Sequence, residues 1–203
     1  MKWTAGTAST WTQPETGSWT GICIRVIDLG TQEKEFKGKT KHVRMCQIVW
    51  EIPDQLDNDN KPLTISKSYT SSLAEKANLR KDLEGWRGRP FTQEELGGFE
   101  VNNIIGKACL LNLVTVQGQK GERVVVAGIS PLPKGMPAPP KTTYHSQFVY
   151  SLDEHNPEVW NQLSERMQDW INRSEERQFA PKATASTASA GNASTITDDE
   201  IPF

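Results

Sequence analysis

Two stretches decide the fold of this chain: residues 18–30, SWTGICIRVIDLG, and residues 39–52, KTKHVRMCQIVWEI. Apolar and β-branched residues dominate both stretches, and such residues favour strands over helices. In the first stretch, Asp28-Leu29-Gly30 ends the apolar run, and the charged residues 31–38 form a connection. We therefore predict two neighbouring strands and a fold that is mainly β.

The rest of the domain follows the same pattern downstream. Residues 63–69, 108–116 and 123–129 read as three further strands, with the flexible loop 117–122 between the last two. A helix over residues 73–86, capped by Ser72, lies between the third and fourth strands. Five strands with a helix in this place predict an OB-fold barrel, a small partly open barrel.

Further local signals mark smaller elements and the end of the domain. Thr92 and Glu95 form a capping-box pattern that opens one short helical turn. Prolines at positions 131, 133, 137, 139 and 140 tolerate neither helix nor ladder, so the barrel domain is assigned to residues 18–135.

The flanking segments differ in composition from the barrel. Residues 1–17 are rich in Thr, Ser and Gly and are predicted to be a flexible arm, and residues 136–155 form a Pro-rich connection. Residues 156–178 read as one amphipathic helix, because Asn156 can cap it and Pro157 suits its first position. Its apolar stripe either docks on its own domain or forms a homo-oligomer surface; it comprises Trp160, Leu163, Met167, Trp170 and Ile171.

Composition narrows the function classes. The net charge is −2, but residues 151–203 carry four basic against ten acidic residues, while residues 1–150 carry 19 against 15. A basic front with an acidic rear suits a polyanion-binding domain with a negatively charged tail. No apolar run approaches the roughly 18 residues of a membrane span, and the start of the chain lacks the apolar stretch of a secretory signal, so we expect a cytoplasmic protein.

Catalytic and metal-binding patterns are missing from the sequence. Cys23, Cys46 and Cys109 lie far apart in apolar runs, so they read as buried thiols in a reducing compartment. The three histidines have no ligand spacing, and neither a Gly-rich phosphate loop nor a Ser/His/Asp constellation is visible. Asp54, Asp57 and Asp59 read as a solvated turn rather than a nuclease metal site. We expect no enzyme, no metal and no cofactor.

Barrels of this kind bind single-stranded nucleic acid with basic side chains on phosphates and aromatic rings on bases, at ~1–3 kcal/mol for each stacked base. The candidate contacts are Arg25, Lys37, Lys39, Lys41, Arg44, Trp50, Lys67, Tyr69, Arg87, Arg89, Lys120 and Arg123. Alternatives remain for several of them. The lysines can protect a strand edge, the two aromatic residues can be core, and the arginines can complement the end of a helix dipole.

The chain ends in Asp198-Asp199-Glu200-Ile201-Pro202-Phe203, after an Ala/Ser/Thr-rich linker that begins at residue 179 and is expected to be disordered. Pro202 holds Ile201 and Phe203 apart, so the ring and the terminal carboxylate can dock together in an apolar pocket ringed by cations. A disordered end without a role is the alternative. The peptide resembles the acidic C-terminal peptide of bacterial single-stranded-DNA-binding proteins. That resemblance implies a docking site for host or phage replication and repair proteins.

The middle of the chain resembles a bacteriophage single-stranded-DNA-binding family with an OB-fold core. The similarity covers about residues 18–135 and is carried by RVIDLGTQ (25–32), KTKHVR (39–44), ANLRKDL (77–83), WRGR (86–89), GK (106–107) and ISPLP (129–133). It implies sequence-tolerant binding of single-stranded DNA during phage replication or recombination, in a bacterial host cell. An adaptor whose barrel binds protein rather than DNA is the alternative function.

Overall fold

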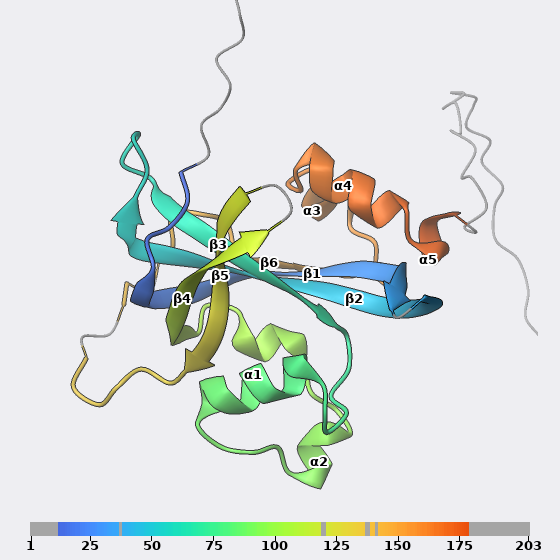
Figure 1. Cartoon of the computed structure of the whole chain (residues 1–203), viewed down its shortest axis with the longest axis horizontal. Helices are drawn as coiled ribbons and strands as arrows, with labels where there is room; N and C mark the ends of the chain where they lie inside the picture. The colour runs from blue at the N-terminus through green and yellow to red at the C-terminus, as the bar shows by residue number, and fades with distance from the viewer. Residues whose placement is uncertain (1–11, 37, 119–120, 137–138, 141, 179–203) are drawn as a thin grey trace, which may run out of the picture.

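The computed structural model describes residues 12–36, 38–118, 121–136, 139–140 and 142–178. Its strands are β1 (Gly17–Phe36), β2 (Lys39–Leu56), β3 (Pro62–Thr70), β4 (Ala108–Gly118), β5 (Gly121–Ser130) and β6 (Phe148–Tyr150). Its helices are α1 (Asn78–Arg87), α2 (Gln93–Leu96), the 3₁₀ turn η1 (Val101–Ile104), α3 (Pro157–Trp160), α4 (Glu165–Asn172) and α5 (Glu175–Gln178). The mainly β fold is confirmed (Figure 1).

The strands form one six-stranded sheet in the order β3-β2-β1-β4-β5, and β6 pairs with β1. All pairs are antiparallel except β1 with β6, which run parallel at residues 25–27 of β1. The first part of β1, residues 17–22, pairs with β4. The sheet is not closed into a barrel, although Cα atoms of β3 and β5 approach within 8 Å of each other.

The β1–β2 hairpin is longer than predicted. Residues 31–36, expected in a charged connection, continue β1 and remain paired with β2 as far as Phe36 opposite Lys39. Glu33, Lys34 and Glu35 are exposed, and their alternating charges do not end the strand because nothing apolar has to be buried there. Gly38 adopts a φ of +71° at the turn, which glycine does without strain.

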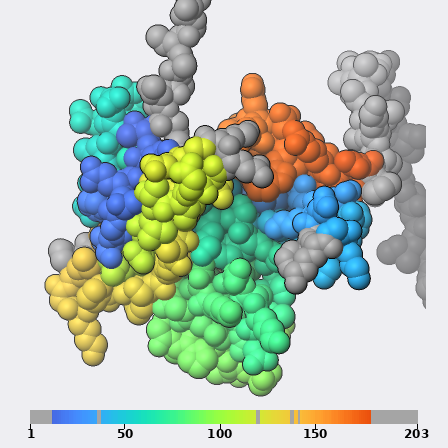
Figure 2. All heavy atoms as spheres, viewed as in Figure 1, coloured from blue at the N-terminus to red at the C-terminus, as the bar shows by residue number. Residues whose placement is uncertain are grey.

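Two hydrophobic clusters lie on opposite faces of the sheet. One packs Trp50, Leu83 and Trp86 between the sheet and α1, and the other packs Ile24, Met45 and Ile171 beneath the C-terminal helices. As a result, every residue of β2 from 45 to 52 is buried. In Figures 1 and 2 the orange C-terminal helices lie on one side of the sheet and the green α1–α2 region on the other.

The three thiols belong to this interior. Cys23, Cys46 and Cys109 are buried and free, as predicted from the sequence. Burial raises the pKa of the Cys23 thiol to about 12 and that of Cys46 to about 11.

The predicted single helix over residues 156–178 is wrong. Asn156 caps and Pro157 begins a helix as expected, but the segment forms three short helices. The hydroxyl of Ser164 accepts a hydrogen bond from the backbone N–H of Met167 and so starts α4 anew. Leu163 and Ile171 are buried in the second hydrophobic cluster, against their own domain. The apolar stripe is therefore largely used within the chain and is not a continuous surface for a second protomer.

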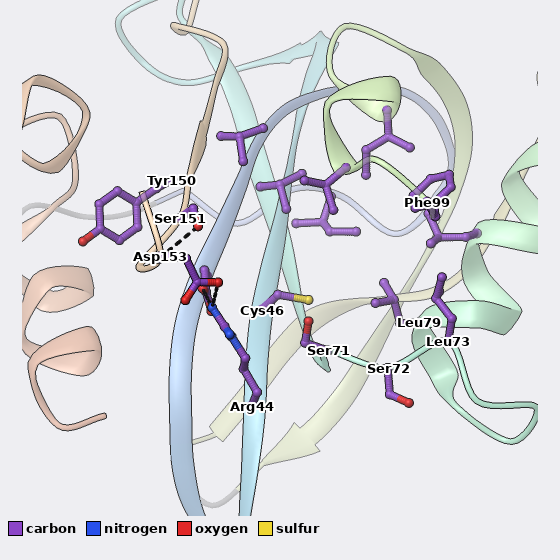
Figure 3. Close-up of a pocket in the computed structure, with 17 residues that line it drawn as sticks. Arg44, Cys46, Ser71, Ser72, Leu73, Leu79, Phe99, Tyr150, Ser151 and Asp153 are labelled. Carbon is purple, nitrogen blue, oxygen red and sulfur yellow. Dashed lines mark hydrogen bonds and ion pairs between the residues drawn. The ribbon is translucent and has the colours of Figure 1, made fainter. Parts of the chain in front are cut away.

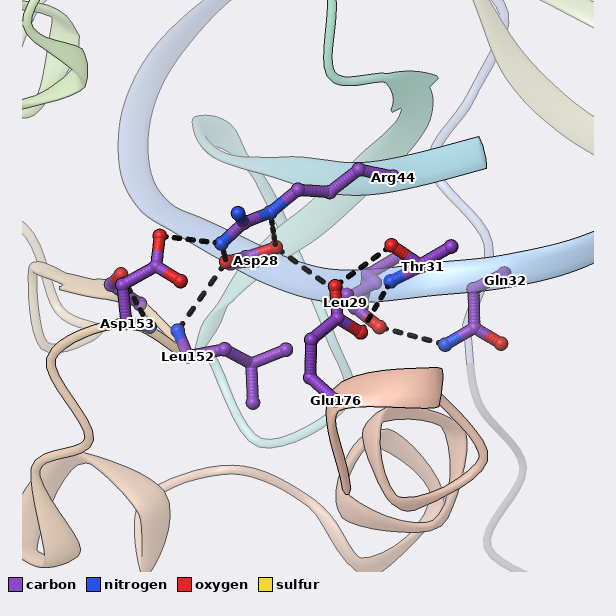
Figure 4. Close-up of polar contacts among 10 residues, drawn as sticks. Asp28, Leu29, Thr31, Gln32, Arg44, Leu152, Asp153 and Glu176 are labelled. Atoms are coloured by element: carbon purple, nitrogen blue, oxygen red, sulfur yellow. Dashed lines mark hydrogen bonds and ion pairs between the residues drawn. The ribbon is translucent and has the colours of Figure 1, made fainter. Parts of the chain in front are cut away.

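Helix α5 covers the open edge of β1. The Glu176 carboxylate accepts hydrogen bonds from the Thr31 backbone N–H and from the Thr31 hydroxyl, both at 2.8 Å (Figure 4). The Gln32 side chain donates to the carbonyl oxygen of Trp170 at 3.2 Å. Unpaired strand edges invite pairing with other chains, and the Glu176 contact satisfies one backbone N–H of this edge.

A polar cluster joins α5 to β6 and is predicted to respond to pH. The Tyr150 hydroxyl and the Arg177 guanidinium both lie 3.0 Å from Nδ1 of His155, so this nitrogen must be an unprotonated acceptor. Burial and the Arg177 charge lower the pKa of His155. In the unfolded chain this histidine has a pKa of about 6.5. Below that pH the unfolded chain therefore binds more protons at His155 than the folded chain does, so the free energy of unfolding falls as pH falls.

The measurement is urea unfolding of the wild type and of His155→Gln at pH 7.5 and pH 5.5, followed by circular dichroism. The glutamine carbonyl keeps an acceptor but does not titrate, so the variant should lose less stability on acidification than the wild type. An equal loss in both proteins would mean that His155 does not contribute to the pH dependence.

Candidate functional site

Three exposed lysines share one face of the projecting β1–β2 hairpin. Lys39 and Lys41 are two residues apart on β2, and Lys34 on β1 is the direct register partner of Lys41. None of the three forms an ion pair with any residue in the described part of the chain. Like charges directly opposite each other destabilise a strand pair. This lysine row (Lys34, Lys39 and Lys41) is therefore a surface that an anion would stabilise.

Sequence reasoning found only part of the row. Lys39 and Lys41 were predicted to point to one side, and the register confirms it. Lys34 was not predicted as a member of the row. Gly38 was a usable signal, because a hairpin that turns at Gly38 places Lys34 opposite Lys41. Lys37, the third member of the predicted ladder, lies outside the described residues, as does Lys120 at the β4–β5 turn.

Arg44, a predicted phosphate contact, is held by two carboxylates. Its guanidinium donates to Asp28 on β1 and, at 2.7 Å, to Asp153 beyond β6 (Figure 4). Hydrogen bonds and charge from both carboxylates raise the pKa of Arg44 further. The phosphate contact at this position stays a prediction; sequence reasoning could not see the acidic partner Asp153, which lies 109 residues away and is near only after folding.

Three more predicted phosphate contacts also have acidic partners. Lys67 lies 2.6 Å from Asp82 of α1, and Arg87 and Arg89 both bind Glu95. Hydrogen bonds from Arg89, the Thr92 backbone and Arg87 hold the pKa of Glu95 well below its usual range. Two arginines therefore share one carboxylate, which leaves a positive excess at the end of α1.

The remaining two cations differ in exposure. Arg25 is half-buried over the ring of Phe148, with 5.1 Å between its guanidinium carbon and the ring centroid, and burial lowers its pKa. Arg123 is exposed on β5, beside the β4–β5 turn. Arg25 and Arg123 thus lie apart from the lysine row in the sheet, and the twelve predicted contacts do not form one surface.

The predicted outward positions of Trp50 and Tyr69 are wrong. Trp50 is fully buried and packs on Trp86 with ring centroids 6.1 Å apart. Tyr69 is 3% exposed, and its hydroxyl donates to Asp82 at 2.8 Å. Both rings face α1 in the first hydrophobic cluster, so neither can stack on a base without unfolding.

A cleft of about 380 Å³ opens between the sheet and α1, a volume within the range of small-ligand sites. Figure 3 shows Arg44 and Asp153 on one wall and Phe99, Leu73 and Leu79 on the other, with Ser71 and Ser72 at the end of β3 between them. Its lining is mostly apolar. The cleft can hold a flat apolar group and offers hydroxyl and carboxylate groups to a polar edge.

The remaining predictions concern the C-terminal tail, membrane spans and metal sites. The tail residues 198–203 lie outside the described residues. No helix of the described residues is long and apolar enough to cross a membrane. Within the same residues, no cluster of three or more His, Cys, Asp or Glu side chains is placed to hold a metal ion.

No protein-family model matches this sequence, and no curated protein matches it either.

Proposed function

We propose that this protein binds single-stranded DNA without sequence preference, during phage DNA replication or recombination in a bacterial host. The observation that carries the proposal is the lysine row, in which Lys34 faces Lys41 across a solvent-exposed hairpin. A phosphate backbone would relieve the repulsion between these lysines and release its own counterions on binding. Lysine–phosphate contacts of this kind would cover the bound single strand and so protect it.

The strand connectivity supports the same function. The strands follow the order β3-β2-β1-β4-β5, and α1 lies between β3 and β4 in sequence. This order is expected of an OB-fold in which β3 and β5 are not hydrogen-bonded to each other. In OB-folds the β1–β2 and β4–β5 loops flank the bound strand. The lysine row lies next to the first of these loops and Arg123 next to the second.

The chain end supplies the second half of the proposal. The peptide Asp198–Phe203 would dock replication or repair proteins of the host or phage through its terminal ring and carboxylates. Removing these six residues should abolish that recruitment and leave the DNA affinity unchanged or higher, because an acidic peptide competes with DNA for cations.

The test is a filter-binding titration of the purified chain with oligo-dT of several lengths, at about 50 mM and about 200 mM salt. We expect length-dependent binding that weakens steeply at the higher salt concentration. Absence of binding even at the lower concentration would refute the proposal.

One observation favours the adaptor alternative. The largely apolar cleft beside α1 has its one cation, Arg44, neutralised by Asp28 and Asp153, which suits an apolar side chain of a protein partner as well as a base. An adaptor would leave oligo-dT unbound at both salt concentrations.

A further inference from the structure

Two cavities lie side by side along α1, and the two together are called the trough. The cleft of about 380 Å³ described above and a second cavity of about 340 Å³ share three lining residues, Leu83, Phe99 and Ile104. The first cavity extends toward Ser71 and Arg44, and the second toward Arg87 and Lys107. The two ends of the trough therefore differ in chemistry, with a mostly apolar end and a cationic end.

Phe99 stands at the junction of the two cavities with a fixed orientation. It is only partly buried, and its ring meets Phe91 edge to face, with 5.2 Å between centroids and 84° between planes. Phe91 in turn lies under the guanidinium of Arg87, whose central carbon is 4.4 Å from the ring centroid. An aromatic ring held in this way offers a preformed face to a planar group, with little loss of side-chain entropy on binding.

The second cavity has an excess of positive charge. Of its lining residues, Arg87 and Lys107 are cationic and Glu95 is the one carboxylate. Glu95 also binds Arg89, so one negative charge serves two arginines. Lys107 is exposed and forms no ion pair with other described residues, and the amide of Asn103 lines the same cavity. Such a group of donors suits a phosphate oxygen.

The opposite face of the sheet has little room for bases. There β1 and β2 are covered by the C-terminal helices, which bury Ile27, Met45 and Val49. The trough lies on the other side of the sheet, beside α1, where Figure 2 shows the green region standing clear of the orange helices. By alternation along β2, Lys39 and Lys41 lie on the face of Val43 and Met45, so a strand held by the lysine row would pass around the hairpin to reach the trough on the α1 side.

We infer that the trough takes one nucleotide unit of the bound strand, with its base against Phe99 and its phosphate between Arg87 and Lys107. The inference rests on the proposed function and adds a base-binding subsite to it. Ser71 and Ser72 line the first cavity, where the base would lie. Their hydroxyls can bond to either donors or acceptors, so the cavity would tolerate any base.

The experiment compares two oligonucleotides of equal length, oligo-dT and its abasic counterpart, by fluorescence anisotropy. Phe99→Leu keeps an apolar side chain but removes the stacking face, and it should weaken oligo-dT binding about fivefold or more while leaving abasic binding unchanged. Phe99→Tyr keeps the ring and should bind both like the wild type. Lys107→Gln should weaken both ligands alike and reduce the salt slope by about 0.7.

Lys81→Gln is the matched control, because Lys81 is an exposed lysine of α1 that lines neither cavity. Equal weakening of both oligonucleotides by Phe99→Leu, or no weakening of either, would overturn the inference while the proposed function stands. The inference is also overturned if Phe99→Tyr keeps the wild-type thermal transition but binds oligo-dT as poorly as Phe99→Leu. If the wild type binds neither oligonucleotide, the proposed function itself fails.

Discussion

Replacing Lys34, Lys39 and Lys41 together by glutamine is expected to lower the affinity for oligo-dT at least tenfold at about 150 mM salt. Each lysine that neutralises a phosphate releases counterions, with a slope of about 0.7 in log K against log salt for a single strand. The triple variant should therefore have a slope smaller by about 2. The hairpin should not lose stability, because the change removes the repulsion between Lys34 and Lys41.

The matched control is the triple variant of Lys76, Lys81 and Lys134 to glutamine. These lysines are exposed, lie outside the hairpin and make no ion pair with the described residues, so the change in net charge is the same. Its affinity should fall far less and its salt slope should stay close to that of the wild type. If the two triple variants lose affinity equally, net charge rather than the lysine row governs binding.

Trp50→Ala is expected to lower the free energy of unfolding by about 3–5 kcal/mol. The indole is fully buried between β2 and α1, next to Trp86, and its removal leaves a large cavity in the first hydrophobic cluster. The loss is measured by urea unfolding followed by tryptophan fluorescence and circular dichroism. A base-stacking Trp50 would instead leave stability almost unchanged and weaken DNA binding.

Trp50→Phe separates packing from polarity. The indole N–H of Trp50 is buried and has no hydrogen-bond partner in the described residues, so phenylalanine removes an unsatisfied donor while keeping an aromatic ring. The cost should be under about 2 kcal/mol, since volume loss and donor removal oppose each other. A cost as large as that of alanine would show that the nitrogen has a partner, such as a buried water molecule.

Local features of the structure were predictable because their causes are local. The Thr92–Glu95 capping box is present with both of its hydrogen bonds, and Asn156 caps α3 with Pro157 at the first helical position. The α1 boundary was less accurate. Ser72 was predicted to cap a helix at Leu73, but α1 begins at Asn78 and Ala77 occupies the cap position without a side-chain bond. The residues between them form turns that no strong local signal distinguishes from a helix.

The candidate site could be predicted only in part. Lys39 and Lys41 project from a strand whose alternation is visible in the sequence, and the structure places them on one face. Lys67 and Arg87 were expected to meet phosphate, but each has a carboxylate from another element beside it. Phe99 carries no motif, and Lys107 was noted only as part of the family resemblance; the packing of α1 and η1 against the sheet sets both around one cavity.

By itself the sequence determined five of the six strands, the helix between β3 and β4 and the segregation of charge along the chain, because periodicity, capping and composition act over a few residues. Strand β6 lies in the segment predicted to be a Pro-rich connection. Only the tertiary structure decided which faces of those strands are covered. Period-two alternation assigns Trp50 and Met45 to opposite faces of β2 but cannot say that both faces are buried, one by α1 and one by a segment about 120 residues further along. The partners of Arg44 were decided in the same way, because Asp153 is remote in sequence and near only after folding.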